Sequence, residues 1–133
     1  MEGLDEFEQA VLDKLLAGSH PVLVALRVQA ERARLASREY TGAGFFCSFE
    51  VPSDATLLTS QQDFEFGDVD AVVDGLEHGA GFIIFVRGGC LDTLEGYSYE
   101  EPWPEEIRTF KLTYRREPRE LQLPELLPGV SPS

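Results

Sequence analysis

The chain has 133 residues, a length that corresponds to one domain, and its 43% apolar residues are ordinary for a globular protein. Its 24 Asp and Glu against 11 Lys and Arg give a net charge of −13, which disfavours binding to nucleic acid or to an anionic membrane. No apolar run approaches the ~18–20 residues of a membrane span, the N-terminus is acidic where a secretory signal is basic, and two cysteines exclude a disulfide-rich framework.

Two helices are predicted at the N-terminus. In residues 4–17, apolar side chains recur every three or four positions, acids lie in the first turn, and Gly18 is typical of the position after a helix end. A second helix is predicted over residues 21–37, because Pro21 suits a first helical turn and apolar residues again follow the helical period. The short connection favours an antiparallel helical hairpin.

The period then changes to that of strands. Residues 40–51 alternate apolar and polar side chains and are rich in aromatic residues, which predicts a half-buried strand. Its expected core-facing side chains are Phe45, Cys47, Phe49 and Val51. Residues 64–66 and 69–73 predict shorter strands, the second with one acidic side.

A hairpin is predicted where residues 80–86 and 90–97 are joined by Gly88 and Gly89, because a type I′ turn needs positive φ at both central positions. Residues 82–86 are apolar on both faces, so we expect a central strand that is covered on both sides. The helical hairpin would cover one side, and a second subunit or the C-terminal tail would cover the other.

Residues 107–114 predict a further strand, with Phe110, Leu112 and Tyr114 on one face. The following prolines and leucines predict an extended arm over residues 118–133, which packs on its own body or on a neighbour. The expected fold class is α+β: an N-terminal antiparallel helical hairpin packed on a mostly antiparallel five- or six-stranded sheet, in one domain over residues 1–117 with a Pro-rich C-terminal tail.

The charge is concentrated in the middle of the chain. Residues 1–49 carry a net charge of −2 and residues 107–133 a net charge of +2, whereas residues 50–106 carry fourteen acids and one base, Arg87. Such a field attracts basic partners or cations. The alternative is a solvated acidic surface that only keeps the protein soluble.

Several familiar kinds of site are disfavoured. The Gly-Ala-Gly-Phe sequence occurs at residues 42–45 and 79–82, but both copies lead into strands, whereas a phosphate-binding loop leads into a helix. Cys47 and Cys90 lie in apolar strands, and the acids near Cys90 disfavour a thiolate, so both are expected to be buried packing residues. His78 is a single histidine near carboxylates, more typical of a turn than of a metal ligand. We therefore predict no catalytic residue, no metal and no cofactor.

The most unusual segment is residues 94–106, which combines two tyrosines, the only tryptophan and five carboxylates. Flanking prolines hold Trp103 in a stiff loop, and an aromatic side chain surrounded by acids suits a basic peptide, a guanidinium or an ammonium group. The predicted partner-binding residues are Glu95, Tyr97, Tyr99, Glu100, Glu101 and Trp103. The alternative is a structural clip with Trp103 against the sheet.

Four segments together resemble a set of small single-domain bacterial proteins of uncharacterised function: LLAGSHPVL at residues 15–23, SREYTGAGFF at 37–46, GLEHGAGF at 75–82 and LEGYSY at 94–99. The resemblance covers about residues 8–107. It implies a bacterial cytoplasmic protein and assigns no catalytic residue.

Three functions remain open at this point. The leading hypothesis is a non-enzymatic cytoplasmic interaction protein whose acidic surface binds a basic protein partner, as an immunity protein or antitoxin does. The second is a small enzyme that uses Glu95 and His78 for acid–base chemistry, with Glu95 opposite Phe82 and its pKa raised by partial burial. The third is a structural homodimer without ligand, joined by an uncovered sheet face or by exchanged tails.

Overall fold

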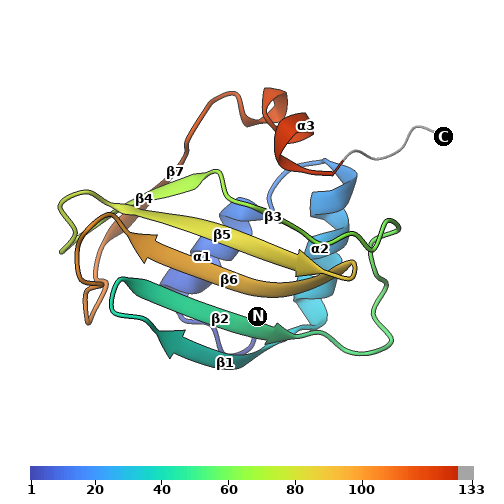
Figure 1. Cartoon of the computed structure of the whole chain (residues 1–133), viewed down its shortest axis with the longest axis horizontal. Coiled ribbons are helices and arrows are strands. Elements are labelled where there is room, and N and C mark those ends of the chain that lie inside the picture. The colour runs from blue at the N-terminus through green and yellow to red at the C-terminus, as the bar shows by residue number, and fades with distance from the viewer. Residues whose placement is uncertain (129–133) are drawn as a thin grey trace.

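Residues 1–128 are described by a computed structural model, which shows an α+β fold with three α-helices and one seven-stranded antiparallel sheet over these residues (Figure 1). The elements in chain order are α1 (Glu6–Leu15), α2 (Pro21–Arg32), β1 (Arg34–Tyr40), β2 (Gly44–Glu50), β3 (Phe64–Phe66), β4 (Val69–Val73), β5 (Ala80–Arg87), β6 (Cys90–Ser98), β7 (Phe110–Tyr114), a 3₁₀ turn (Arg119–Leu121) and α3 (Leu123–Leu126). The α+β prediction is therefore confirmed, with more strands than the five or six expected.

The sheet has the order β1-β2-β6-β5-β4-β7, and β3 pairs with the end of β5 that β4 leaves unpaired. Gly67 lies between β3 and β4, and a Cβ atom at this position would stand 1.9 Å from the carbonyl oxygen of Phe82. Only glycine allows so close an approach of two backbones. The predicted β5–β6 hairpin is confirmed, and Gly88 and Gly89 have φ of +59° and +77°.

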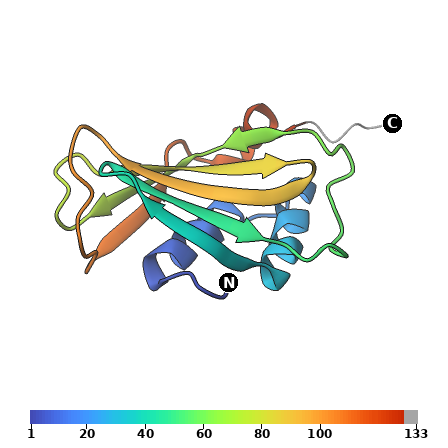
Figure 2. The ribbon, with the colours of Figure 1, turned by 60° about the horizontal axis from the view of Figure 1, so that its bottom comes forward.

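The first two helices lie on one face of the sheet (Figure 2). α1 contacts β4 and β7, whereas α2 contacts β6, so each helix packs on its own strands. The strand faces turned toward the helices are apolar and buried, and they include Phe45, Phe82 and Leu94. The period-two alternation expected for residues 45–49 is confirmed by this burial pattern.

The opposite face of the sheet carries no covering element among residues 1–128, and Figure 1 views the molecule from this side. We call it the open face. Of the two covers expected for this side of β5, the described part of the C-terminal tail does not lie on it, and a second subunit stays a prediction. Ile83 and Phe85, on the open face of β5, are half-buried by their neighbours in the sheet, whereas Phe82 and Ile84 are completely buried under the helices.

The second helix is shorter than predicted. It ends at Arg32, and residues 34–40, the first four of which were expected to be helical, form the edge strand β1. The sequence contains no glycine or proline at this point, so the helical period runs on without a visible stop. The backbone of residues 34–40 instead forms its hydrogen bonds with β2. A tertiary contact therefore overrides the helical pattern of the local sequence here.

The C-terminal tail is folded, not extended as predicted, over its described residues. Pro124 lies in the first turn of α3, where a missing backbone N–H costs nothing, and Leu123 and Leu127 are buried against the body. Residues 129–133 of the predicted arm lie outside the described residues. Among the helices described, none has both the length and the apolar character needed to cross a membrane.

Candidate cation-binding site beside Trp103

The segment between β6 and β7 is fastened to two turns of the molecule. The backbone N–H of Trp103 donates to the carbonyl oxygen of Gly42 at 2.7 Å, in the β1–β2 turn. The carboxylate of Glu101 accepts from the backbone N–H groups of Glu77 and His78 at 2.7 and 2.8 Å, in the β4–β5 turn. These bonds hold the segment in one position relative to the sheet.

Glu101 therefore acts as a clip between two loops. The two backbone N–H groups lower the pKa of its carboxyl, because they stabilise the ionised form. The sequence grouped Glu101 with the partner-binding residues, whereas the structure gives its oxygens an internal use. The clip expected from the sequence was Trp103 against the sheet with its neighbouring carboxylates in water, whereas the carboxylate of Glu101 itself binds two backbone N–H groups.

The indole of Trp103 turns toward the helix-covered side of the sheet and is half-buried. Its ring meets that of Phe45 on β2 edge to face, with 5.3 Å between centroids, and lies 6.2 Å from that of Phe7 on α1. Phe7 in turn packs edge to face on Phe110 of β7, at 5.0 Å. Three separate elements thus build one aromatic wall around Trp103.

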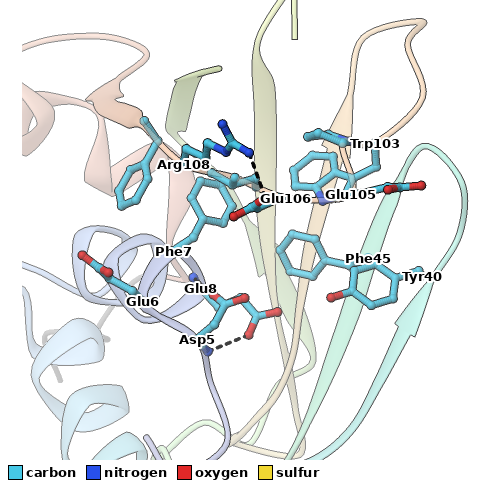
Figure 3. Close-up of a pocket in the computed structure, with 13 residues that line it drawn as sticks. Asp5, Glu6, Phe7, Glu8, Tyr40, Phe45, Trp103, Glu105, Glu106 and Arg108 are labelled. Carbon is cyan, nitrogen blue, oxygen red and sulfur yellow. Dashed lines mark hydrogen bonds and ion pairs between the residues drawn. The ribbon is translucent and has the colours of Figure 1, made fainter. Parts of the chain in front are cut away.

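A cavity of about 290 Å³ opens beside this wall (Figure 3). Its aromatic lining residues are Phe7, Tyr40, Phe45, Trp103 and Phe110, and its carboxylates are Asp5, Glu6, Glu8, Glu105 and Glu106. The cavity lies at the start of α1, where the helix dipole alone would favour an anion. The surrounding carboxylates reverse that preference, because each carries a full negative charge.

Some of these carboxylates already have partners. Asp5 caps α1 by accepting from the backbone N–H of Glu8 at 2.8 Å, and Glu106 lies 3.5 Å from the exposed guanidinium of Arg108. No ion pair among residues 1–128 involves Glu6 or Glu105. The cavity therefore combines aromatic faces with carboxylates that lack a cation, an arrangement suited to a guanidinium or ammonium group.

Glu8 belongs to a buried cluster behind the cavity. Its carboxylate accepts from the guanidinium of Arg38 on β1 and from the thiol of Cys47 on β2, the latter at 3.3 Å. Burial alone would raise the pKa of Glu8, but the hydrogen bonds from Arg38 and from the backbone of Asp5 outweigh it and lower the pKa. Glu8 is thus a buried anion that positions β1 and β2 against α1.

Cys47 is a packing residue, in agreement with the expectation from sequence. It is completely buried, and burial together with the negative charge of Glu8 raises the pKa of its thiol to about 12. Cys90 is half-buried, and burial and Asp92 also raise the pKa of its thiol. Neither cysteine therefore provides a thiolate nucleophile at neutral pH.

The structure separates the predicted site residues. Glu95 and Tyr97 lie on the open face of β6, on the other side of the sheet from the indole of Trp103. Glu95 stands opposite Ile83, so the expectation that it faces Phe82 was wrong by one residue. Burial and Glu65 raise its pKa, as expected for a partly buried carboxylate.

The remaining two residues, Tyr99 and Glu100, follow β6. The Tyr99 hydroxyl lies 3.4 Å from Asp70, which also pairs with Arg115 at 2.9 Å. Glu100 is exposed and has a φ of +59° in the turn that leads to the Trp103 segment. Its side chain is available to solvent next to the loop, whereas Tyr99 packs edge to face on Tyr97 at 5.6 Å.

Glu95 and His78 are not brought together. His78 lies in the turn before β5, five residues before Ile83, the residue opposite Glu95. No three histidine, cysteine or carboxylate side chains within residues 1–128 gather in a way that would hold a metal ion.

The sequence missed part of the site. Phe7, Phe45 and Phe110 were expected only as core residues, and Glu6 only as a favourable charge at a helix start. No local signal joins these residues, because Phe7 lies between two carboxylates, Glu6 and Glu8, whereas Phe45 lies between Gly44 and Phe46. Comparison of the chain with protein-family models, curated proteins and solved structures gives no match.

Proposed function

We propose that the chain is a non-enzymatic interaction protein that binds a basic protein partner and holds one of its cationic side chains in the cavity beside Trp103. The observation that carries this proposal is the lining of the cavity of about 290 Å³, in which five aromatic rings and five carboxylates stand against a single cationic side chain, Arg108. An immunity protein or antitoxin that neutralises a basic toxin in a bacterial cytoplasm is one concrete form.

The chemistry of the cavity favours a cation in two ways. A guanidinium or ammonium group over the face of an aromatic ring gains roughly 0.5–2 kcal/mol, more as water is excluded. Glu6 and Glu105 add a charge interaction at the rim, where salt weakens it. The net charge of −13 would also accelerate the encounter with a basic partner.

The sole tryptophan makes a direct test possible, because the intrinsic fluorescence of the protein reports on the cavity. We expect an arginine-rich peptide to change the emission of Trp103 saturably, and an acidic peptide of equal length to leave it unchanged. Raising the salt concentration is expected to weaken the binding steeply.

Matched variants locate the binding. Glu105→Gln removes a carboxylate of the cavity, and Glu120→Gln removes an exposed carboxylate outside it. We expect the first variant to weaken binding of the arginine-rich peptide severalfold and the second to leave it unchanged. Equal effects of the two variants would show that only net charge matters, and would refute a specific site.

The two alternatives have less support. The enzyme hypothesis needs Glu95 and His78 in one site, whereas Glu95 pairs with Ile83 inside the sheet and His78 lies in the turn before β5. The homodimer with exchanged tails needs a tail that leaves its own body, whereas Leu123 and Leu127 are buried in the same chain. To identify the partner, we would capture proteins from the native host at low and high salt.

A further inference from the structure

Two adjoining hollows lie on the open face, on the side of the sheet opposite the Trp103 cavity. One encloses about 240 Å³ between β1, β2, β5 and β6, and the other about 280 Å³ beside β3 and β5. Phe85 and Arg87 line both, so the two hollows form one shallow groove. Its carboxylates are Glu39, Asp63 and Glu65.

The register of the strands shows how the groove continues into the face. Phe46, Glu95 and Ile83 occupy one cross-strand row, and Ser48, Thr93, Phe85 and Glu65 occupy the next. Residues in such rows point to the same side of the sheet and contact one another. The open face therefore has an apolar strip of Phe46, Ile83 and Phe85 with carboxylates along it.

One guanidinium already rests on this strip. The side chain of Arg87 lies over the ring of Phe85, with 5.6 Å to its centroid, and 3.5 Å from Asp92. Arg87 is the only base in residues 50–106. Its position shows that the face receives a cation stacked on an aromatic ring and held by a neighbouring carboxylate.

We infer that the open face is a second docking surface, whose occupant is an amphipathic segment with Lys or Arg side chains beside its apolar ones. The apolar side chains of this segment cover Phe46, Ile83 and Phe85, and its cations meet Glu39, Glu65 and Glu95. A second copy of this chain fits poorly. In a two-fold interface the same patch of both copies is buried, so the carboxylates of one copy would be brought close to the carboxylates of the other.

The charge also excludes other occupants. Nucleic acid and anionic lipid would bring phosphates toward the carboxylates of the groove. The inference goes beyond the proposed function, because the groove and the Trp103 cavity lie on opposite sides of the sheet and share no lining residue.

The probe is a fluorescein-labelled amphipathic peptide of alternating Leu and Lys faces, about 18 residues long, with binding measured by anisotropy. Phe85→Ser is expected to weaken binding about tenfold or more, because it removes the apolar contact at the centre of the groove. Glu95→Gln is expected to weaken it severalfold and to reduce its dependence on salt. Circular dichroism verifies that each variant is folded. If Phe85→Ser is not, Glu95→Gln and Glu65→Gln carry the test.

Two control variants match these changes outside the strip. Val72→Ser removes an exposed apolar side chain elsewhere on the sheet, and Glu120→Gln removes an exposed carboxylate that lines neither the groove nor the Trp103 cavity. Both are expected to bind the peptide as the wild type does. Glu105→Gln is measured beside them to detect any peptide that binds in the Trp103 cavity. Loss of binding in Glu105→Gln with none in Phe85→Ser and Glu95→Gln would place the peptide in the cavity and overturn the inference while leaving the proposed function intact.

Two further outcomes overturn the inference. One is peptide binding that none of the open-face variants changes. The other is a dimer, detected by sedimentation, that Phe85→Ser dissociates, because the occupant would then be a second copy of the chain.

Discussion

Replacement of Arg119 by methionine tests the most buried charge pair of the protein. Its guanidinium forms two hydrogen bonds with Asp68, at 2.7 and 3.1 Å, and the two side chains are only 5% and 9% exposed. It also donates to the carbonyl oxygens of Leu15, the last residue of α1, and of Ala17, at 2.5 and 2.6 Å, and lies 4.5 Å from the centroid of the Tyr114 ring. One side chain thereby joins the tail, β4 and the end of α1.

The expected loss of folding free energy comes from the Asp68 carboxylate, which Arg119→Met leaves without a partner. Arg119→Met keeps much of the side-chain volume but leaves Asp68 charged, buried and without its cation, which costs about 3–5 kcal/mol of folding free energy. With a urea dependence of about 1.5 kcal/mol per M, the midpoint of unfolding falls by about 2–3 M. Urea titrations followed by circular dichroism at neutral pH measure this shift.

Two comparisons make the result specific. Arg116→Met replaces an exposed arginine of the same segment and is expected to change stability by less than about 0.5 kcal/mol. The double variant Asp68→Asn with Arg119→Met is expected to lose less than the sum of the two single variants, because no uncompensated charge remains. A loss below about 1 kcal/mol in Arg119→Met would refute the argument that this pair fixes the tail.

Three smaller predictions concern the other buried polar groups. Because the folded state lowers the pKa of Glu8, the ionised carboxylate stabilises the protein above the unfolded pKa of about 4.3. In urea titrations, the difference in stability between the wild type and Glu8→Gln should therefore shrink as the pH falls below that value. A difference that stays constant with pH would contradict this prediction. In the native protein at about pH 8, Ellman's reagent should modify Cys90 before Cys47, because the Cys47 thiol is buried and has a pKa of about 12. Denaturant should make both thiols reactive. Equal rates of modification of the two cysteines in the native protein would contradict this prediction. Gln29→Leu should lower the free energy of unfolding by about 1–3 kcal/mol, because the Gln29 side chain hydrogen-bonds to the backbone of Leu91, Gly89 and Thr56. Thermal unfolding measures this loss, and an unchanged melting temperature would rule out a stabilising role for these bonds.

Local sequence patterns were sufficient to predict the elements whose buried face follows from the spacing of their apolar residues. The first helix, the apolar alternation of β2 and the hairpin at Gly88 and Gly89 were all predicted, because each depends on neighbours a few residues away. The end of α2 was not, since residues 34–40 become a strand only when β2 is beside them. Local preference carries no information about that partner.

The candidate site was predicted only in part for the same reason. Trp103 and the acids around it were visible as an unusual composition, but the position of the Trp103 segment depends on the hydrogen bond from the backbone N–H of Trp103 to the carbonyl oxygen of Gly42, sixty-one residues away in sequence. The aromatic wall likewise needs Phe7, Phe45 and Phe110 from three elements. Patterns within thirteen consecutive residues could not separate Trp103 from Glu95 and Tyr97, which the sheet places on its opposite faces.

The ring of Phe45 owes its place to a residue that does not line the cavity. A Cβ atom on Gly96, its cross-strand neighbour, would stand 2.3 Å from the Phe45 ring, so that ring lies flat only because position 96 has no side chain. A methyl group at position 96 would displace the Phe45 ring, which lines the cavity, without altering any charge. Under the proposed function, replacement of Gly96 by alanine would therefore change the shape of the space open to a cation, while the electrostatic attraction of the surrounding carboxylates remained constant.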